Sequence, residues 1–161
     1  DAGHITAELM KGFLCKRSLN KTDKMLFEGE EQLADKLQYG LPAIALSAQS
    51  ELITAIANDN GAEMVFAQQV FAYGRKNDVL IAISTSGNSL NVVNAVKVAK
   101  KIDMKVLALT GAELGIVGRL ADVVISAPEY KTFKIQEYHL PLYHALCAML
   151  EAKFFDSNEG E

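Results

Sequence analysis

The chain has 161 residues, which is enough for one domain with a substantial hydrophobic core. Half of the residues are hydrophobic, 22% are charged and the net charge is −4, which is typical of a globular protein and argues against direct nucleic-acid binding. No apolar run is long enough to span a membrane. The two cysteines, Cys15 and Cys147, lie far apart and indicate a reducing compartment, so we expect a cytoplasmic protein.

The first forty residues predict helices around one basic loop. Residues 1–14 have the pattern of the body of a helix that is already under way at Asp1, so we expect the protein to continue upstream. Residues 15–27 are polar and basic and predict a flexible loop, which is either an ordinary surface loop or a lid over an anionic ligand. An acidic helix is expected over residues 29–37, ending at Gly40.

From Pro42 onward, short apolar strands alternate with helices. The pattern predicts strands at 43–46, 78–83, 105–109 and 123–126. It predicts helices at 50–57, 63–73, 114–120 and 132–155, and one more helix that follows the strand at 78–83 and ends at residue 101. A turn is expected at 58–61 and a frayed tail at 156–161. The alternation favours an α/β fold, namely a doubly wound, mainly parallel sheet flanked by helices, in a single domain over residues 1–161.

The turn after residues 79–83 carries the clearest functional signal. An apolar strand is followed by Ser84-Thr85-Ser86-Gly87-Asn88-Ser89, directly before an apolar-periodic helix. Hydroxyl donors, unpaired N–H groups and the positive end of a helix dipole together suit a phosphate group. The alternative is an ordinary capped turn with Ser86 or Asn88 as the N-cap. Thr110 and Gly111, at the tip of the next strand, are candidates for a second polar rim.

All three histidines of the chain belong to two polar groups. His4 and Glu8 share a face of the first helix. The last helix adds Gln136, Glu137, His139 and His144. Together these side chains match a zinc site or an acid/base pair, although each histidine alone is more often structural. Gln136 and His144 are about 12 Å apart along a helix axis, so one metal would need a kink at Pro141 or a site shared between subunits.

These motifs resemble the SIS (sugar isomerase) domain family and, within it, the phosphoheptose isomerase group. The matching segments lie outside residues 15–40: Ile83–Ser89, His4-x-x-x-Glu8, Leu41–Ala45, Asn58-Asp59, Leu109–Gly111, and Ile135–Glu137 followed by His144. The resemblance implies a three-layer SIS-type fold that interconverts sedoheptulose 7-phosphate and D-glycero-D-manno-heptose 7-phosphate through an enediol. It also implies a homotetramer with active sites at subunit interfaces.

The resemblance further implies roles for individual residues. Glu8 and His144 would move the proton between C1 and C2 of the sugar. One zinc ion per active site would be held by His4, Glu8, Gln136 and His144. The phosphate would be bound by Ser84, Thr85, Ser86 and Ser89. The remainder of the substrate would contact Asp1, Asn58, Asp59 and Gln136.

The chain also departs from the family pattern. The resemblance implies a helix, a strand and a glycine- and serine-rich loop upstream of Asp1, which the 161 residues do not include. Residues 15–40 are longer than usual, and Gly12 and Phe13 stand where an arginine is expected shortly after Glu8, with Arg17 nearby. One alternative function is a non-catalytic SIS module that binds a sugar phosphate or a protein partner such as the replication initiator DnaA. Another is an SIS enzyme acting on an amino-sugar phosphate. The presence of Glu8 and His144 favours catalysis, because phosphate binding needs neither.

Overall fold

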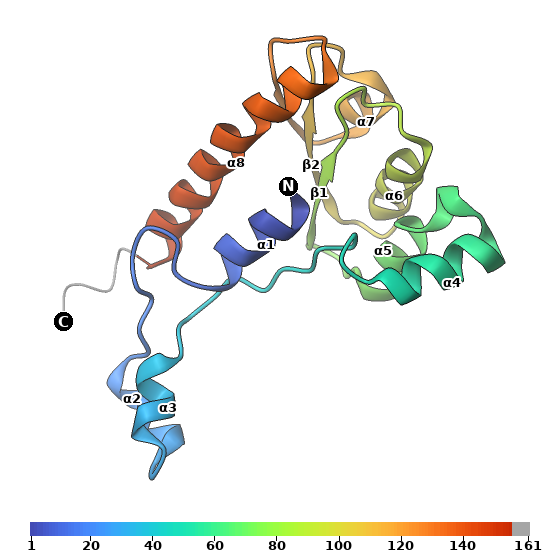
Figure 1. The fold of residues 1–161 in the computed structure, drawn as a ribbon. Coiled ribbons are helices and arrows are strands. Elements are labelled where there is room, and N and C mark those ends of the chain that lie inside the picture. The colour runs from blue at the N-terminus through green and yellow to red at the C-terminus, as the bar shows by residue number, and fades with distance from the viewer. Residues whose placement is uncertain (156–161) are drawn as a thin grey trace. The chain divides into compact units, whose positions relative to one another are not determined.

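The structure of the protein is a computed structural model that describes residues 1–155 (Figure 1). These residues form two compact units, which we call the sheet unit (residues 1–2 and 45–142) and the helical unit (residues 3–44 and 143–155). Helix α8 (Thr132–Phe155) runs unbroken through Pro141 and contributes to both. The single domain expected over residues 1–161 stays a prediction, and the expected frayed tail lies outside the described residues.

The sheet unit is built on three parallel strands in the order β1-β2-β3. They are β1 (Val79–Ile83), β2 (Lys105–Thr110) and β3 (Val123–Ser126), each within one residue of its expected bounds. Val79 pairs with Lys105 and Leu107 with Val123, so the carboxyl ends of the strands share one edge of the sheet. An open parallel sheet flanked by helices confirms the α/β class.

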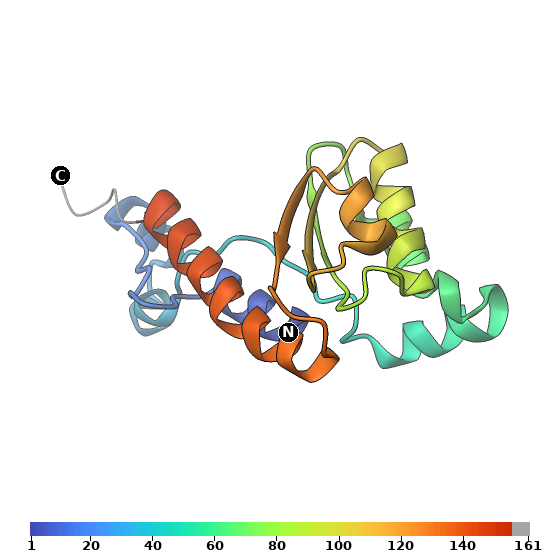
Figure 2. The ribbon, with the colours of Figure 1, turned by 90° about the horizontal axis from the view of Figure 1, so that it is seen from above.

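Four α-helices and one 3₁₀ turn lead into or connect the strands. They are α4 (Ser50–Asn60), η2 (Ala62–Met64), α5 (Ala67–Tyr73), α6 (Leu90–Lys101) and α7 (Gly115–Leu120). Figure 2 shows α6 and α7 on the same side of the strands. Val93 and Val96 of α6 join Val106 and Ala108 of β2 in the core, and each of the four is at most 1% exposed. Their spacing follows the helix and strand periods.

The helical unit contains α1 (Ala2–Met10) from Gly3 onward, α2 (Lys21–Lys24), η1 (Met25–Phe27), α3 (Glu31–Lys36) and the second part of α8. Helix α1 lies beside this part of α8 and buries Ile5 and Leu9 (Figures 1 and 2). The basic loop expected at 15–27 is partly helical, with Asn20 capping α2, and its flexibility stays a prediction. None of the helices within residues 1–155 is long and apolar enough to cross a membrane.

Three expected elements between residues 43 and 73 are wrong. The strand at 43–46 does not form, because these residues pair with no neighbouring strand in the described part of the chain. Just before them, the Leu41 N–H donates to the Leu9 carbonyl of α1 at 2.9 Å. The turn at 58–61 is helical as far as Asn60, and Gly61 then ends α4 with a φ of 101°. The helix expected at 63–73 is divided into η2 and α5.

Gly87 and Gly115 meet where the turn after β1 contacts the start of α7. Both have left-handed backbones, with φ of +64° and +59°. A Cβ atom on Gly87 would lie 2.1 Å from the Leu114 carbonyl oxygen. The Val117 N–H donates to the Gly87 carbonyl at 2.9 Å, so this close approach ties the turn to α7.

We expect Gly87→Ala to lower the free energy of unfolding by at least about 1–2 kcal/mol, because the added Cβ meets backbone and the left-handed conformation is strained. Urea denaturation measures this change. Gly3→Ala is the control, since a Cβ there has no neighbour within 4 Å, and alanine in a helix is expected to raise stability slightly. A Gly87→Ala protein as stable as the wild type would contradict the close backbone contact and the left-handed conformation described for Gly87.

Candidate functional site

The hydroxyl-rich turn lies between the carboxyl end of β1 and the start of α6, as the sequence predicts. Ser84 is 6% exposed, and its N–H donates to the Leu109 carbonyl of β2 at 3.0 Å. Its hydroxyl donates to the Ser89 hydroxyl at 3.2 Å, and the Gly87 N–H donates back to the Ser84 carbonyl at 3.0 Å. The turn is therefore closed by its own hydrogen bonds and fixed to the neighbouring strand.

The N-cap of α6 is Ser89, whose side chain makes no capping hydrogen bond. A turn capped by Ser86 or Asn88 is therefore wrong. Asn88 Oδ1 instead accepts from the Ile116 N–H of α7 at 3.1 Å, and Ser86 Oγ accepts from the Asn88 N–H at 3.2 Å. A twelve-residue helix that begins without a cap from its own N-cap residue offers an N-terminus suited to an anion.

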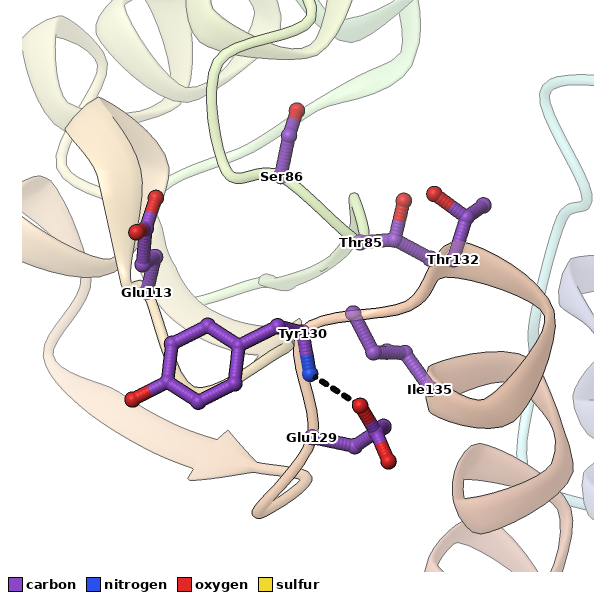
Figure 3. A pocket seen from close by; sticks show the side chains of 7 residues that line it. All are labelled: Thr85, Ser86, Glu113, Glu129, Tyr130, Thr132 and Ile135. Carbon is purple, nitrogen blue, oxygen red and sulfur yellow. Dashed lines mark hydrogen bonds between the residues drawn. The ribbon is translucent and has the colours of Figure 1, made fainter.

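A cavity of about 100 Å³ lies beside this turn (Figure 3). Its lining residues are Thr85, Ser86, Glu113, Glu129, Tyr130, Thr132 and Ile135. Two of them, Thr85 and Ser86, belong to the predicted phosphate set. Two further lining residues carry hydroxyls, Tyr130 and Thr132. Neither was predicted from the sequence, because they stand just before and at the start of α8 with no clustered signal around them. The cavity thus brings hydroxyl groups from two segments to one place.

Glu129 shapes the segment that leads from β3 into α8. Its carboxylate accepts hydrogen bonds from the N–H groups of Lys131 at 3.0 Å and Tyr130 at 2.7 Å. These bonds hold the pKa of the Glu129 carboxyl below its usual value, so the group is ionised at neutral pH. Lys134 Nζ lies 3.8 Å from it and partly offsets the charge beside the cavity.

The expected second polar rim does not form at Thr110. The Thr110 side chain is fully buried, and its hydroxyl donates to the Gly111 carbonyl at 3.1 Å. His139 is fully buried as well, and its Nε2 donates to the Thr110 carbonyl at 3.1 Å. His139 is therefore a structural histidine that joins α8 to β2. The Gly111 N–H donates to the Thr85 carbonyl at 3.0 Å, which links the same strand tip to the hydroxyl-rich turn.

In the helical unit, α1 and α8 bring His4, Glu8 and His144 together. His4 Nε2 lies 3.2 Å from Glu8 Oε1 and 3.4 Å from His144 Nε2. The Glu8 side chain is 13% exposed and the His4 side chain 43% exposed, so the cluster is accessible from solvent. A carboxylate beside two imidazoles can take up and return a proton.

Tyr143 orients the His4 ring, and sequence reasoning missed it. Its hydroxyl and His4 Nδ1 share a hydrogen bond of 2.9 Å, and the two rings meet edge to face with centroids 5.4 Å apart. Burial, with smaller contributions from Cys147 and Glu8, raises the pKa of the Tyr143 phenol, so it stays neutral. A neutral phenol can either donate a hydrogen bond to Nδ1 or accept one from it, so Tyr143 can hold the His4 ring in this orientation in either tautomer.

Within residues 1–155, no group of three or more histidine, cysteine, aspartate or glutamate side chains is placed, as it stands, to hold a metal ion. His4, Glu8 and His144 instead contact one another. Gln136 is exposed and belongs to the sheet unit, as do Asp1, Asn58 and Asp59. None of those four residues lines the cavity beside the turn. Their expected roles stay predictions.

A buried ion pair fixes the chain that follows α1. Arg17 Nε donates to Glu151 Oε1 at 2.8 Å, and the two side chains are 1% and 3% exposed. Glu151 also accepts from the N–H groups of Phe13 at 2.8 Å and Leu14 at 2.7 Å. Burial alone would raise the pKa of the Glu151 carboxyl, but these N–H groups and the Arg17 guanidinium outweigh it and lower the pKa.

Comparison with protein families and curated proteins points to one group. A model described as "SIS domain" matches residues 22–111, more than half of the chain. A phosphoheptose isomerase from Helicobacter pylori strain P12 is 44% identical over 160 residues, covering 96% of this chain and 83% of the relative. One from Shewanella baltica strain OS155 is 46% identical over 164 residues, covering 100% of this chain and 73% of the relative.

Solved structures of the same group also match the fold. A phosphoheptose isomerase from Neisseria gonorrhoeae superposes with a TM-score of 0.75 at 38% identity, covering 94% of this chain and 70% of that one. One from Francisella tularensis gives a TM-score of 0.73 at 33% identity, with coverages of 91% and 68%.

The lowered pKa of Glu151 predicts an acid-sensitive stability. A carboxyl whose folded-state pKa lies below its ordinary value of 4.5 stabilises the folded protein at pH values above 4.5. This stabilisation is lost as the pH falls through the folded-state pKa. The difference in free energy of unfolding between the wild type and Glu151→Gln should therefore be largest above about pH 5 and narrow below about pH 4. Urea denaturation at several pH values measures it. A difference independent of pH would contradict the prediction.

Proposed function

The chain belongs to the SIS domain family and, within it, to the phosphoheptose isomerases, and from this we propose that it interconverts sedoheptulose 7-phosphate and D-glycero-D-manno-heptose 7-phosphate. The observation that carries the proposal is the convergence of His4, Glu8 and His144 from two helices far apart in the sequence. A module that only binds a phosphorylated ligand has no need for such a cluster. This favours the isomerase over the non-catalytic alternative.

We assign the proton transfer to Glu8 and His144. In the ketose-to-aldose direction, a base removes a proton from C1, an enediol forms, and C2 receives a proton as the carbonyl moves to C1. Glu8 suits the base, because its carboxylate is mostly buried and is held by His4. His144 suits the partner that protonates and deprotonates the oxygens. Tyr143 keeps the His4 ring in one orientation through Nδ1.

We propose a zinc ion, one per active site, with His4, Glu8, Gln136 and His144 as its ligands. His4 Nε2 lies 3.2 Å from Glu8 Oε1 and 3.4 Å from His144 Nε2. Ligand atoms around a tetrahedral zinc are separated by about 3.3 Å when the bonds are about 2.0–2.1 Å long. The spacing of the His4, Glu8 and His144 donor atoms therefore suits a tetrahedral zinc, once the direct contacts between these three side chains are exchanged for contacts to the metal. Gln136 is included as the fourth ligand because the family resemblance implies it. When bound, zinc supplies a Lewis acid that stabilises developing negative charge on the sugar oxygens.

We propose that the phosphate binds at the hydroxyl-rich turn. The supporting features are the start of α6, where the N-cap Ser89 makes no side-chain capping bond, and the cavity lined by Thr85 and Ser86. The proposed phosphate-binding residues are Ser84, Thr85, Ser86 and Ser89. The proposed contacts to the rest of the sugar are Asp1, Asn58, Asp59 and Gln136.

We further propose a cytoplasmic homotetramer with active sites at subunit interfaces. Several large apolar residues of α8 are solvent-exposed in the single chain, including Leu140 at 42%, Met149 at 71% and Phe154 at 54%. A second subunit packed on these residues would remove them from water. The two widely separated cysteines fit a reducing compartment.

The proposed reaction is tested by incubating the protein with sedoheptulose 7-phosphate and following the sugar by NMR. We expect the aldose to appear, to stop appearing after treatment with a chelator, and to return when zinc is added. Absence of the aldose from folded, zinc-supplied protein would contradict the proposed reaction. Turnover unaffected by complete metal removal would contradict the zinc proposal alone.

Variants separate proton transfer from phosphate binding. Glu8→Gln and His144→Ala should each lower kcat by about 10²–10⁴-fold, because each removes an acid/base group. Ser86→Ala is the matched comparison and should mainly raise KM, by roughly tenfold or more, through loss of a hydrogen bond to a charged phosphate. If Glu8→Gln and His144→Ala both keep wild-type kcat, the assignment of these residues is wrong. Tight binding of the sugar phosphate by a wild type without turnover would favour the binding module.

A further inference from the structure

We propose that Arg17 and Glu151 are positioning residues, whose buried ion pair holds helix α1 so that His4 and Glu8 face His144. Neither residue belongs to the sets proposed above for the proton, the metal or the phosphate. The inference rests on the proposed function for its kinetic consequences, and it makes a structural claim that can be tested without turnover.

The Arg17 guanidinium binds the carboxyl end of α1. Nη1 donates to the Leu9 carbonyl at 2.7 Å and Nη2 donates to the Glu8 carbonyl at 3.0 Å. These carbonyls belong to the last turn of a helix, where no intrahelical N–H is available and a cation is favoured by the helix dipole. Arg17 therefore binds the backbone of the same residue whose side chain is the proposed base.

The other edge of the guanidinium connects α1 to α8. Nε donates to Glu151, and the Arg17 Cζ atom lies 4.4 Å from the centre of the Phe155 ring. Glu151 stands seven residues after His144, two helical turns along the same face of α8. The chain between α1 and Arg17 is fixed to the same carboxylate through Phe13 and Leu14. One guanidinium and one carboxylate thus set both the end of α1 and its distance from the face that carries His144.

A role in positioning explains this arrangement better than stability alone. Buried ion pairs often contribute little net stability, and apolar residues of similar size frequently replace them without loss. Helix α1 has only nine residues, fewer than the roughly 12–15 that an isolated helix needs to be marginally stable. Its orientation must therefore come from contacts such as these. Small errors in the placement of reacting groups can cost about a hundredfold in rate.

The fork of arginine is essential to the proposed role. Three different nitrogens of Arg17 reach three acceptors on α1 and α8. A lysine ammonium keeps the charge but has one nitrogen at the end of its side chain, so it cannot reproduce this planar pattern. Arg17→Lys should therefore restore part, but not all, of what Arg17→Met loses.

Arg75 provides a matched control. Its Nη1 donates to the carbonyls of Ala72, Tyr73 and Gly74 at the end of α5, at 3.2, 3.2 and 2.9 Å. It is also an arginine that binds carbonyls at the end of a helix, but it is exposed and belongs to the sheet unit. Arg75→Met should leave the kinetics and the histidine cluster unchanged.

The experiment compares the wild type with Arg17→Met, Arg17→Lys and Arg75→Met at a temperature where circular dichroism shows all four to be folded. The readouts are kcat and KM for sedoheptulose 7-phosphate, and nuclear Overhauser effects between the rings of His4 and Tyr143. For Arg17→Met we expect kcat to fall at least about tenfold while KM changes by less than about twofold, with loss of the ring contacts. Arg17→Lys should lie between Arg17→Met and the wild type.

An Arg17→Met protein with wild-type kcat and intact ring contacts would overturn the inference. So would an equal loss of kcat in Arg75→Met, which would indicate a general effect on stability. If Arg17→Met does not fold, Arg17→Lys and Glu151→Gln carry the same comparison with a smaller expected fall in kcat. If the wild type itself does not convert the sugar, the proposed function fails. The ring contacts then decide the positioning claim by themselves.

Discussion

The carboxylate of Glu151 is the constraint on which the helical unit depends. It is buried on α8 and accepts hydrogen bonds from backbone N–H groups just beyond α1 and from Arg17. A buried carboxylate without such donors would be strongly unfavourable, and so would buried donors without the carboxylate. The chain after α1 is therefore fixed against α8 at Glu151. The backbone contacts of Arg17 at Glu8 and Leu9 extend that constraint to the helix that carries the proposed base.

The sheet unit meets a separate constraint, which is the close approach of backbone at Gly87 and Gly115. It closes the hydroxyl-rich turn over the start of α6 and ties it to α7, with Asn88 bonded to the α7 backbone. The turn is thereby fixed to its neighbours, while Thr85 and Ser86 line the cavity beside it. Each unit thus offers one part of the proposed chemistry: an anion site in the sheet unit, and a proton-transfer cluster in the helical unit.

The sequence predicted the features whose signals are local. Strand β3, the turn at Ser84–Ser89 and the His4–Glu8 pair follow from short apolar runs, clustered hydroxyls and helical spacing. Features that depend on distant residues were missed: Glu151 meets Phe13 across 138 positions, and Tyr143 meets His4 across 139. The strand expected at 43–46 failed because a strand needs a neighbour to pair with, and these residues have none in the described part of the chain despite their local β propensity. The turn expected at 58–61 failed because Asn58 to Asn60 extend α4 until Gly61 ends it.

We propose that this protein moves a carbon-bound proton rather than only binding a sugar phosphate. The most direct measurement is solvent exchange at C1 and C2 of sedoheptulose 7-phosphate in deuterated water, followed by NMR. An enediol route with Glu8 as base predicts deuterium at C1 of recovered ketose and at C2 of the aldose. Saturable binding of the sugar phosphate with no deuterium at either carbon, in folded protein supplied with zinc, would contradict the account.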